Sequence, residues 1–314
     1  MTYKMKQVFH IGLLLFLCSY TVIAQSPLKV TPVDDAPKGF DRLFSKQVDI
    51  FGIAIFATRR TPDEKLLHAA GVLAQYLDND SDGLDNELVI QALRKSKGAV
   101  VMSATERAAE KIDVHRYIPE KVWDSMTVLG LYAEETHPGG AARGVFDATY
   151  EEILHLITSA GYANAYPDVF GEKPDTAMDK ARGGHFRRVP RKYPNGAWST
   201  YDDRTCNYAC QITEYVYWGL TSILGAQDFP GRHEDISKEW RLNTAAKITD
   251  GNPTLYKLLT DPSMPFRPSS RKGNTILRNG IRWGLTNPRK QKALLNKTLQ
   301  RTRTSRAAEL CPLC

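Results

Sequence analysis

The residues between positions 78 and 87 have the types and the spacing to bind a cation. Aspartate stands at alternate positions, as Asp78, Asp80 and Asp82, and Gly83 follows. Calcium takes about six to eight oxygen ligands, and alternate carboxylates in a tight loop can all face one ion. Glycine permits the sharp turn that such a loop requires. Three carboxylates in so short a segment repel one another unless a cation lies between them, so we expect a calcium site here.

The same segment resembles the calcium-binding loop of the EF-hand family, with the flanking helices, over residues 64–93. The resemblance implies oxygen ligands along the loop and a bidentate glutamate at its twelfth position. Val89 stands at that position, so the second half of the loop must be contracted, and binding should be weak, with a Kd of about 10⁻⁴–10⁻³ M. The competing interpretation is a polar turn without an ion. The expected ligands are Asp78, Asp80, Asp82, the carbonyl of Leu84, and Asp85, Asn86 or Glu87 as the group that closes the site.

A second group of metal-ligating residues is the segment Glu151-Glu152-Ile153-Leu154-His155. Residues three and four positions apart share one face of a helix, so Glu151, Glu152 and His155 should lie together. The segment resembles the His-Glu-x-x-His helix of zinc peptidases, with Glu151 in place of the first histidine. This resemblance implies that Glu151 and His155 hold zinc and that Glu152 activates a water molecule.

A third zinc ligand would have to come from elsewhere in the chain. Glu214 is one candidate, because a carboxylate inside an apolar segment is costly to bury without a partner. That partner could be Arg204, a tyrosine hydroxyl or a metal ion, and His137 and His185 are the other candidate ligands. The Glu-x-x-His pair also resembles one half of a carboxylate-bridged di-iron site, whose second half the sequence lacks. The alternative to a metal site is a buried structural pair of carboxylate and imidazole.

The N-terminus and the cysteines predict secretion. Residues 1–24 have the order of a signal peptide, with two lysines, an apolar stretch at 11–18 and small residues before the expected cleavage site. An even number of cysteines remains after cleavage, which suits an oxidising route, and their pairing stays open. We expect an extracellular protein with no membrane span, and two sequons predict N-glycosylation. The residues concerned are Cys206, Cys210, Cys311 and Cys314 for disulfides, and Asn79 and Asn296 for glycans.

The C-terminal part of the chain is strongly basic. Residues 262–308 contain twelve Lys and Arg and no Asp or Glu, although the net charge of the whole chain is only +7. Such a segment favours an acidic partner. Because secretion argues against nucleic acid, we expect acidic matrix proteins, sulfated glycans or a mineral surface; the competing interpretation is a solubilising tail.

The elements that position these groups are expected to be mainly helices. Residues 61–64 (Thr-Pro-Asp-Glu) are typical of a helix start, and apolar residues then recur at helical spacing as far as Leu77. Residues 48–57 are apolar and β-branched, and their pattern does not distinguish a buried strand from a helix. The predicted fold class is mainly α, with an EF-hand-like helix–loop–helix unit packed on a larger helical, loop-rich body. Further helices are expected at 88–93, 104–111, 150–159, 213–224 and 290–299.

The expected organisation follows from these elements. It comprises a signal peptide at 1–24, an N-terminal leader at 25–60, the EF-hand-like unit at 61–100, a helical body at 101–261 that carries the Glu151–His155 helix and Cys206 and Cys210, and a basic tail at 262–314.

Four segments together resemble a group of secreted invertebrate proteins, some of which occur in the organic matrix of calcified shells. They are the signal peptide, the Leu-Asp-Asn-Asp-Ser-Asp-Gly loop, the Glu-Glu-Ile-Leu-His helix and residues 206–215. The resemblance implies a secreted, non-enzymatic calcium-binding protein of a calcified or other extracellular matrix, with calcium as cofactor. The alternative is a zinc-dependent hydrolase of peptidase type, in which Glu152 would be catalytic.

Overall fold

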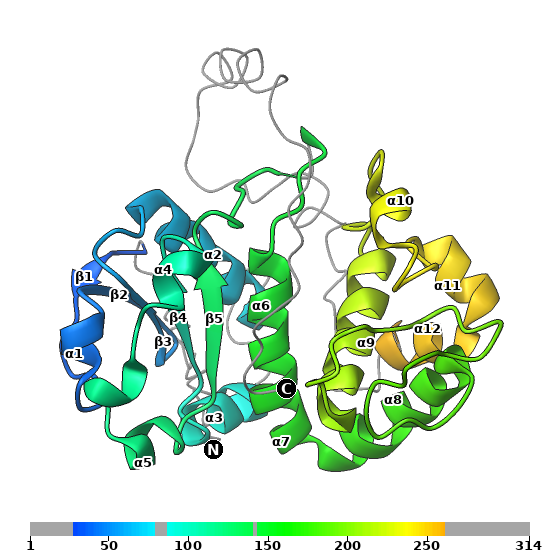
Figure 1. The fold of residues 1–314 in the computed structure, drawn as a ribbon, viewed down its shortest axis with the longest axis horizontal. Helices are drawn as coiled ribbons and strands as arrows, with labels where there is room; N and C mark the ends of the chain where they lie inside the picture. The colour runs from blue at the N-terminus through cyan, green and yellow to red at the C-terminus, as the bar shows by residue number, and fades with distance from the viewer. Residues whose placement is uncertain (1–27, 79–86, 141–142, 261–314) are drawn as a thin grey trace, which may run out of the picture.

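The computed structural model describes residues 28–78, 87–140 and 143–260 of the chain (Figure 1). The expected signal peptide and basic tail lie outside these residues, as do Cys311, Cys314 and both sequons, Asn79 and Asn296. Most of the expected calcium loop also lies outside them, namely Asp80, Asp82, Leu84, Asp85 and Asn86.

A five-stranded mixed sheet forms one half of the molecule, with its strands in chain order (Figure 1). The first three strands are antiparallel neighbours, whereas β3, β4 and β5 run parallel to one another. Phe51 and Gly52 join β2 to β3 and both have positive φ, 54° and 81°, as a tight two-residue hairpin requires. The strands are β1 (Thr31–Pro32), β2 (Lys46–Ile50), β3 (Ile53–Ala57), β4 (Ala99–Ser103) and β5 (Val128–Tyr132).

The predicted fold class, mainly α, is therefore wrong, because the chain has an α/β fold. The ambiguous residues 48–57 supply most of a β-hairpin, and the expected N-terminal leader includes β1, β2 and β3. β4 and β5 were missed for a physical reason. Parallel strands covered on both faces are short and almost continuously apolar, so they lack the alternation by which a half-exposed strand is recognised.

Helices cover both faces of the sheet. On one face, α2 (Asp63–Leu77), α3 (Glu87–Lys95) and α6 (Thr149–Leu156) bury their apolar residues against Ile53, Ile55, Val100 and Leu129. On the other face, Phe56 and Val128 pack against residues in or next to three short helical segments. These segments are α1 (Phe40–Leu43), the 3-10 turn η1 (Val114–Arg116) and α5 (Glu120–Trp123). A further short helix, α4 (Glu106–Ala109), follows β4.

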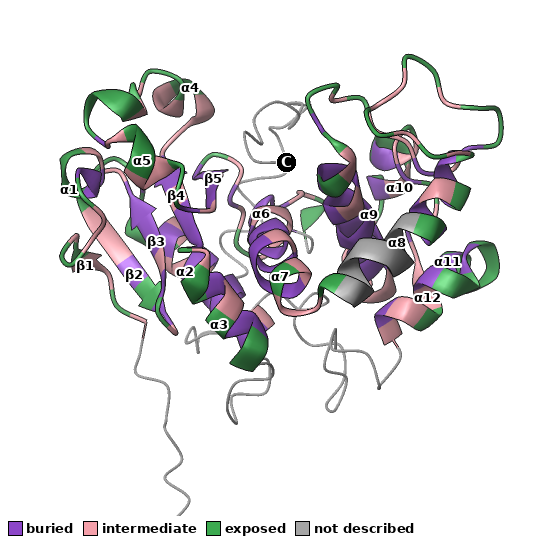
Figure 2. Cartoon of the chain, turned by 90° about the horizontal axis from the view of Figure 1, so that it is seen from below, coloured by how far each residue is buried: buried purple, intermediate pink, exposed green. Residues whose placement is uncertain are grey.

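The second half of the molecule is helical and shares its core with the sheet. The main core continues from the strands through α6 to Tyr215, Val216 and Tyr217 of α9 and to the fully buried Trp240. Buried residues accordingly gather on the strands, on α6 and on α9 (Figure 2). The elements of this half are the π-helical turn η3 (Ile157–Tyr162), α7 (Ala163–Ala165), α8 (Pro167–Arg182), α9 (Tyr208–Ile223), α10 (Arg232–Ile236), α11 (Ala245–Gly251) and α12 (Pro253–Thr260).

Helices α2 and α3 flank the expected calcium loop where the sequence predicts them, since α2 ends at Leu77 and α3 begins at Glu87. They do not form a separate EF-hand-like unit, because both pack on the rest of the α/β core. Over the three described ranges, no helix combines the length and the apolar character that a membrane crossing needs.

Candidate metal centre

The candidate centre lies where the two halves of the molecule meet, between α6 and α9 (Figure 1). Helix α6 carries Glu151, Glu152 and His155, while Ile153 and Leu154 of the same helix are buried in the core. The alternation of apolar and polar residues at helical spacing therefore turns the candidate ligands away from the sheet and toward α9.

The start of α6 is fixed by a buried contact to α2. The carboxylate of Asp147 accepts the backbone N–H of Thr149 at 3.1 Å, and its other oxygen lies 2.7 Å from Nε2 of His68. Burial alone would raise the pKa of Asp147, but the hydrogen bond and charge of His68, together with hydrogen bonds from Thr149 and the backbone of His137, outweigh burial and lower the pKa. This buried contact between His68 and Asp147 anchors α6 at the turn that precedes its candidate ligands.

The start of α9 is fixed by a cap and a disulfide. The side chain of Asn207 accepts the N–H of Cys210 at 3.0 Å, which satisfies one of the free donors of the first turn. Cys206 and Cys210 form a disulfide across the same turn, so these two of the four cysteines, whose pairing the sequence left open, pair with each other. Glu214 follows one turn after Cys210 and is buried, with 6% of its side chain exposed.

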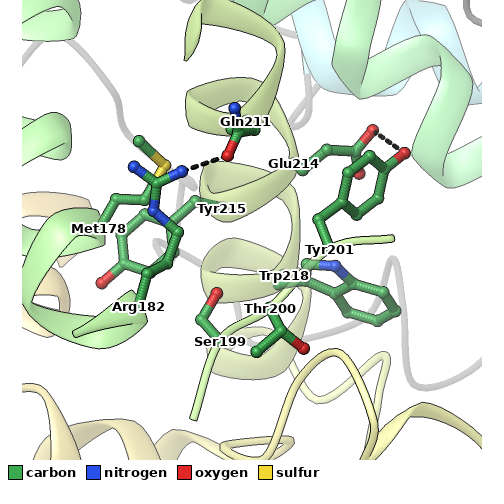
Figure 3. A pocket seen from close by; sticks show the side chains of 9 residues that line it. All are labelled: Met178, Arg182, Ser199, Thr200, Tyr201, Gln211, Glu214, Tyr215 and Trp218. Atoms are coloured by element: carbon green, nitrogen blue, oxygen red, sulfur yellow. Dashed lines mark hydrogen bonds between the residues drawn. The ribbon is translucent and has the colours of Figure 1, made fainter. Parts of the chain in front are cut away.

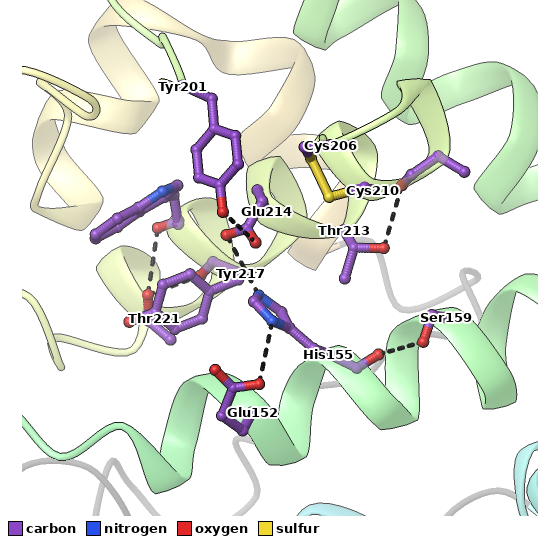
Figure 4. A network of polar contacts seen from close by, with 12 residues as sticks. Glu152, His155, Ser159, Tyr201, Cys206, Cys210, Thr213, Glu214, Tyr217 and Thr221 are labelled. Atoms are coloured by element: carbon purple, nitrogen blue, oxygen red, sulfur yellow. Dashed lines mark hydrogen bonds and ion pairs between the residues drawn. A yellow bond between two sulfur atoms is a disulfide. The ribbon is translucent and has the colours of Figure 1, made fainter. Parts of the chain in front are cut away.

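Glu151, His155 and Glu214 form a compact cluster. One ligand atom from each can be chosen so that all three lie within 4.8 Å of one another. Nε2 of His155 is 3.4 Å from Oε2 of Glu214 (Figure 4). Donors around a tetrahedral zinc ion, at about 2.1 Å from it, are about 3.4 Å apart. A small movement of Glu151 would therefore complete a three-residue site.

The polar atoms of this cluster lack ordinary hydrogen bonds. Among the described residues, neither ring nitrogen of His155 nor Oε2 of Glu214 has a hydrogen-bond partner, although all three atoms are buried. Buried polar atoms without partners are rare in native proteins and often mark a bound ion or water. Of these atoms, Nε2 of His155 and Oε2 of Glu214 face each other at 3.4 Å, so a candidate position for an ion lies beside them.

The charges of the cluster favour a cation as well. Burial disfavours the charged form of His155, but Glu214, Glu152 and Glu151 together outweigh burial and raise its pKa to about 10. Burial and the charge of Glu214 raise the pKa of Glu151 to about 7. A metal ion would provide the positive charge that these carboxylates otherwise obtain from a proton on His155.

Two further groups border the cluster. Oε2 of Glu152 lies 3.9 Å from Nδ1 of His155, and 27% of the Glu152 side chain is exposed, so this carboxylate is accessible to water. The hydroxyl of Tyr201 donates to Oε1 of Glu214 at 3.1 Å (Figure 4). Of the partners that the sequence offered for Glu214, a tyrosine hydroxyl is thus present.

The structure also locates the remaining predicted site residues. His137 and His185 do not belong to the cluster; His185 instead contacts Asp179, with Nδ1 2.8 Å from Oδ2. Of the expected calcium ligands, Asp78 lies buried at the end of α2 and Glu87 is exposed at the start of α3. Sequence reasoning missed Tyr201 as a specific neighbour and also missed Arg182 and Trp218, which line a pocket beside Glu214.

Comparisons with protein-family models, with curated proteins and with solved structures found no match to this chain. The case for a function therefore rests on the geometry of its own residues.

Proposed function

We propose that the protein is a metal-dependent hydrolase of the zinc-peptidase type, with one ion held by Glu151, His155 and Glu214. The observation that carries the proposal is the convergence of these three side chains, from helices some sixty residues apart in sequence, on a buried point with unsatisfied donor atoms. A catalytic zinc site needs three protein ligands and one open position, and a three-residue cluster provides that number.

The ligand set favours zinc but also suits neighbouring metals. Imidazole and carboxylate are both ordinary zinc ligands. Two carboxylates and a neutral imidazole would neutralise a divalent ion, whereas the His-His-Glu set of known zinc peptidases leaves one positive charge. This ion would therefore be a weaker Lewis acid, and oxygen-preferring metals such as Mn²⁺ are expected to compete with zinc.

The roles of the surrounding residues follow from their positions. A bound metal would polarise a carbonyl group and a water molecule. Glu152, next to the cluster and reached by solvent, would take the proton from that water and return it to the leaving group. The hydroxyl of Tyr201 would hold the carboxylate of Glu214 in its ligating orientation.

Metal binding by purified protein tests this proposal. After removal of metals with a chelator, zinc, Mn²⁺ and Ca²⁺ are titrated separately by calorimetry into the wild type, Glu214→Gln and Glu239→Gln. Glu239 is a nearby carboxylate outside the cluster, so its variant is the matched control for lost charge. We expect one zinc or Mn²⁺ ion per chain in wild type and control, and affinity about 100-fold lower or worse in Glu214→Gln. No bound ion, or equal binding by all three proteins, would overturn the proposal.

Calcium binding by the loop at 78–87 stays a separate proposal for a different site. It is supported by helices α2 and α3, which end and begin at the two sides of this loop, and by its alternating carboxylates. Calcium titration into the wild type and an Asp80→Asn/Asp82→Asn variant tests it. Loss of calcium binding in the variant, with zinc binding retained, would assign the two ions to two sites.

We also propose that the protein is secreted, and the disulfide between Cys206 and Cys210 supports an oxidising compartment. Extracellular calcium, at millimolar concentration, would then occupy even a weak loop site. Expression of the full-length chain in cultured cells tests this proposal. We expect to recover it from the medium with its N-terminal segment removed; retention inside the cells at full length would contradict the proposal.

A further inference from the structure

A pocket opens beside the candidate metal centre, on the side of α9 that faces α8 (Figure 3). It is partly open to solvent. Glu214 and Tyr201 lie at one end of the pocket, and Arg182 and Gln211 at the other. The remaining lining residues are Met178, Ser199, Thr200, Tyr215 and Trp218. Because Glu214 belongs to both, a group bound in this pocket would lie next to an ion at the centre.

Arg182 brings a buried guanidinium to the pocket. Its side chain is only 3% exposed, and it donates to Oε1 of Gln211 and, at 2.6 Å, to Oδ1 of Asp179. Its Nε–H is buried and has no acceptor among the described residues. Asp179 also contacts His185 at 2.8 Å, so its charge is shared between two side chains. The guanidinium of Arg182 therefore has one N–H donor without an acceptor, and Asp179 neutralises its positive charge only in part.

A second unused donor lines the same pocket. The indole Nε1–H of Trp218 is buried without an acceptor in the described parts of the chain. Of the four hydroxyls in the lining, that of Thr200 donates to the carbonyl of Lys238 at 2.5 Å and that of Tyr201 to Glu214 at 3.1 Å. The side-chain oxygen of Gln211 is already occupied by Arg182. Two buried N–H donors that line the pocket, Nε–H of Arg182 at one end and Nε1–H of Trp218 near Tyr201, thus lack acceptors among the described residues, which favours a ligand that brings acceptor oxygens.

We propose that this pocket binds a carboxylate of the substrate, and that it sets the specificity of the hydrolase. Arginine forms its strongest hydrogen bonds with carboxylates and phosphates. The free space in the pocket as a whole is close to the size of one water molecule, so a small planar group such as a carboxylate fits it better than a phosphate. The link to hydrolysis rests on the proposed function, whereas carboxylate binding by the pocket does not.

The first experiment compares two hydroxamates on the zinc-loaded full-length chain. Succinic monohydroxamate and butyrohydroxamate share a metal-chelating group and differ by a carboxylate in place of a methyl group. We expect the carboxylate to bind about tenfold more tightly or better in the wild type. This preference should vanish in Arg182→Met, fall in Trp218→Phe, which removes only the indole donor, and persist in Arg204→Met, an exposed matched control. If Arg182→Met does not fold, Arg182→Lys and Trp218→Phe carry the comparison.

The second experiment examines the metal-free chain. The indole N–H resonance that Trp218→Phe removes is followed by nuclear magnetic resonance during titration with acetate or acetamide. We expect a saturable shift with acetate alone. Equal binding of both hydroxamates, with no acetate shift, would overturn the carboxylate pocket while leaving the metal centre intact. Failure of both hydroxamates to bind, together with an acetate shift, would overturn the hydrolase and leave the pocket; failure in both experiments would overturn both.

The carboxylate could come from an acidic side chain or from a peptide C-terminus, and a third comparison separates these sources. One competitor peptide carries a single internal glutamate and an amidated end. The other has no acidic side chain and a free C-terminal carboxylate. The peptide that displaces succinic monohydroxamate identifies the source, and a failure of both to displace it would contradict the role of the pocket in substrate binding.

Discussion

At the scale of single residues, the surroundings of each carboxylate distinguish a candidate metal ligand from a candidate general base. His155 is almost fully buried, with Glu214 at 3.4 Å and Glu152 at 3.9 Å. Glu214 is buried and belongs to the ligand cluster, whereas Glu152 is partly exposed and outside it. The same residue type can therefore serve as ligand at one position and as general base at another.

The role of Glu152 gives the first prediction. Glu152→Gln keeps the size of the side chain but removes its ability to accept a proton, so hydrolysis should fall by about 10²–10⁴-fold. Because Glu152 is not among the clustered ligands, the variant should still bind one metal ion per chain. Turnover of a peptide substrate and metal content measure the two effects. Undiminished turnover would exclude Glu152 as the base, and Glu64→Gln, an exposed change on α2, is the control.

Glu135 gives a prediction about pH and stability. Burial, followed by the charges of Glu106 and Glu134, raises its pKa to about 7 from an ordinary value of 4.5. The folded protein thus holds this proton more tightly than the unfolded chain does. Both states are protonated below pH 4.5, so the cost of ionising Glu135 is absent there, grows between pH 4.5 and 7, and is constant above pH 7.

Glu135→Gln should therefore match the wild type in stability near pH 4.5 and exceed it at pH 8. The gain should be about 1 kcal/mol, once solvent screening of a half-buried group is allowed for. Urea unfolding at both pH values measures it, with Glu64→Gln as the control. A gain that is the same at both pH values would show that ionisation of Glu135 is not its cause.

The residues of the centre could be found from sequence only in part. Glu151, Glu152 and His155 are recognisable because helical spacing places them on one face, and Glu214 because it is a lone carboxylate in an apolar segment. Arg182 gave no such signal. Its role depends on Gln211, twenty-nine residues later, and on a pocket lined by two other segments. No local sequence pattern indicates that these residues lie close together in the fold.

At the scale of elements, α9 must hold Glu214 in register with α6. Its packing against α12 depends on Gly219, since a Cβ there would lie 2.8 Å from Cδ2 of Leu255 and 2.9 Å from Cδ1 of Leu259. Both leucines are fully buried, so neither can turn away into solvent. Helices α9 and α12 therefore lie so close together at Gly219 that only glycine fits there without a shift of its neighbours.

Gly219→Ala should therefore destabilise the protein. Overpacking costs about 1–3 kcal/mol, while the higher helix propensity of alanine returns at most about 1 kcal/mol, so the net loss should be about 1 kcal/mol. Gly130→Ala in β5 is the matched control, because its nearest contact would be a tyrosine hydroxyl at 3.9 Å. Chemical unfolding compares the two. Equal stability of both variants would mean that α12 can move away from α9 without cost.

Helices and strands differed in how well they could be predicted. The helix at 63–77 begins in the predicted start segment and repeats its apolar residues over several turns, so its local pattern identifies it, although Thr61 donates to the carbonyl of Met102 and does not cap the helix. Each of the parallel strands β4 and β5 is five residues long and is stabilised by neighbours and by helices on both faces. Whether these segments form strands depends on partner strands far away in sequence. Because local patterns do not reveal those partners, the sequence is interpreted as mainly helical.

At the scale of the whole molecule, the sheet half and the helical half share one core. Residues of β3, α6 and α9 belong to the same buried cluster, so the halves should unfold together. The proposed ion would join them a second time, since Glu151 and His155 come from α6 and Glu214 from α9. Ions that bind only the folded state stabilise it by mass action.

Zinc should consequently raise the unfolding temperature of the whole molecule in a single step. At about one hundred times its Kd, an ion that binds only the folded chain adds about 2.7 kcal/mol, which for a protein of this size is about 5–10 °C. Calorimetric scans of metal-free and zinc-loaded protein measure the shift, and Glu214→Gln should show none whereas Glu239→Gln should show all of it. Two separate transitions, with only one moved by zinc, would instead mean that the ion binds within one half. An equal shift in Glu214→Gln would place the stabilising ion elsewhere, because α9 would then contribute nothing to holding it.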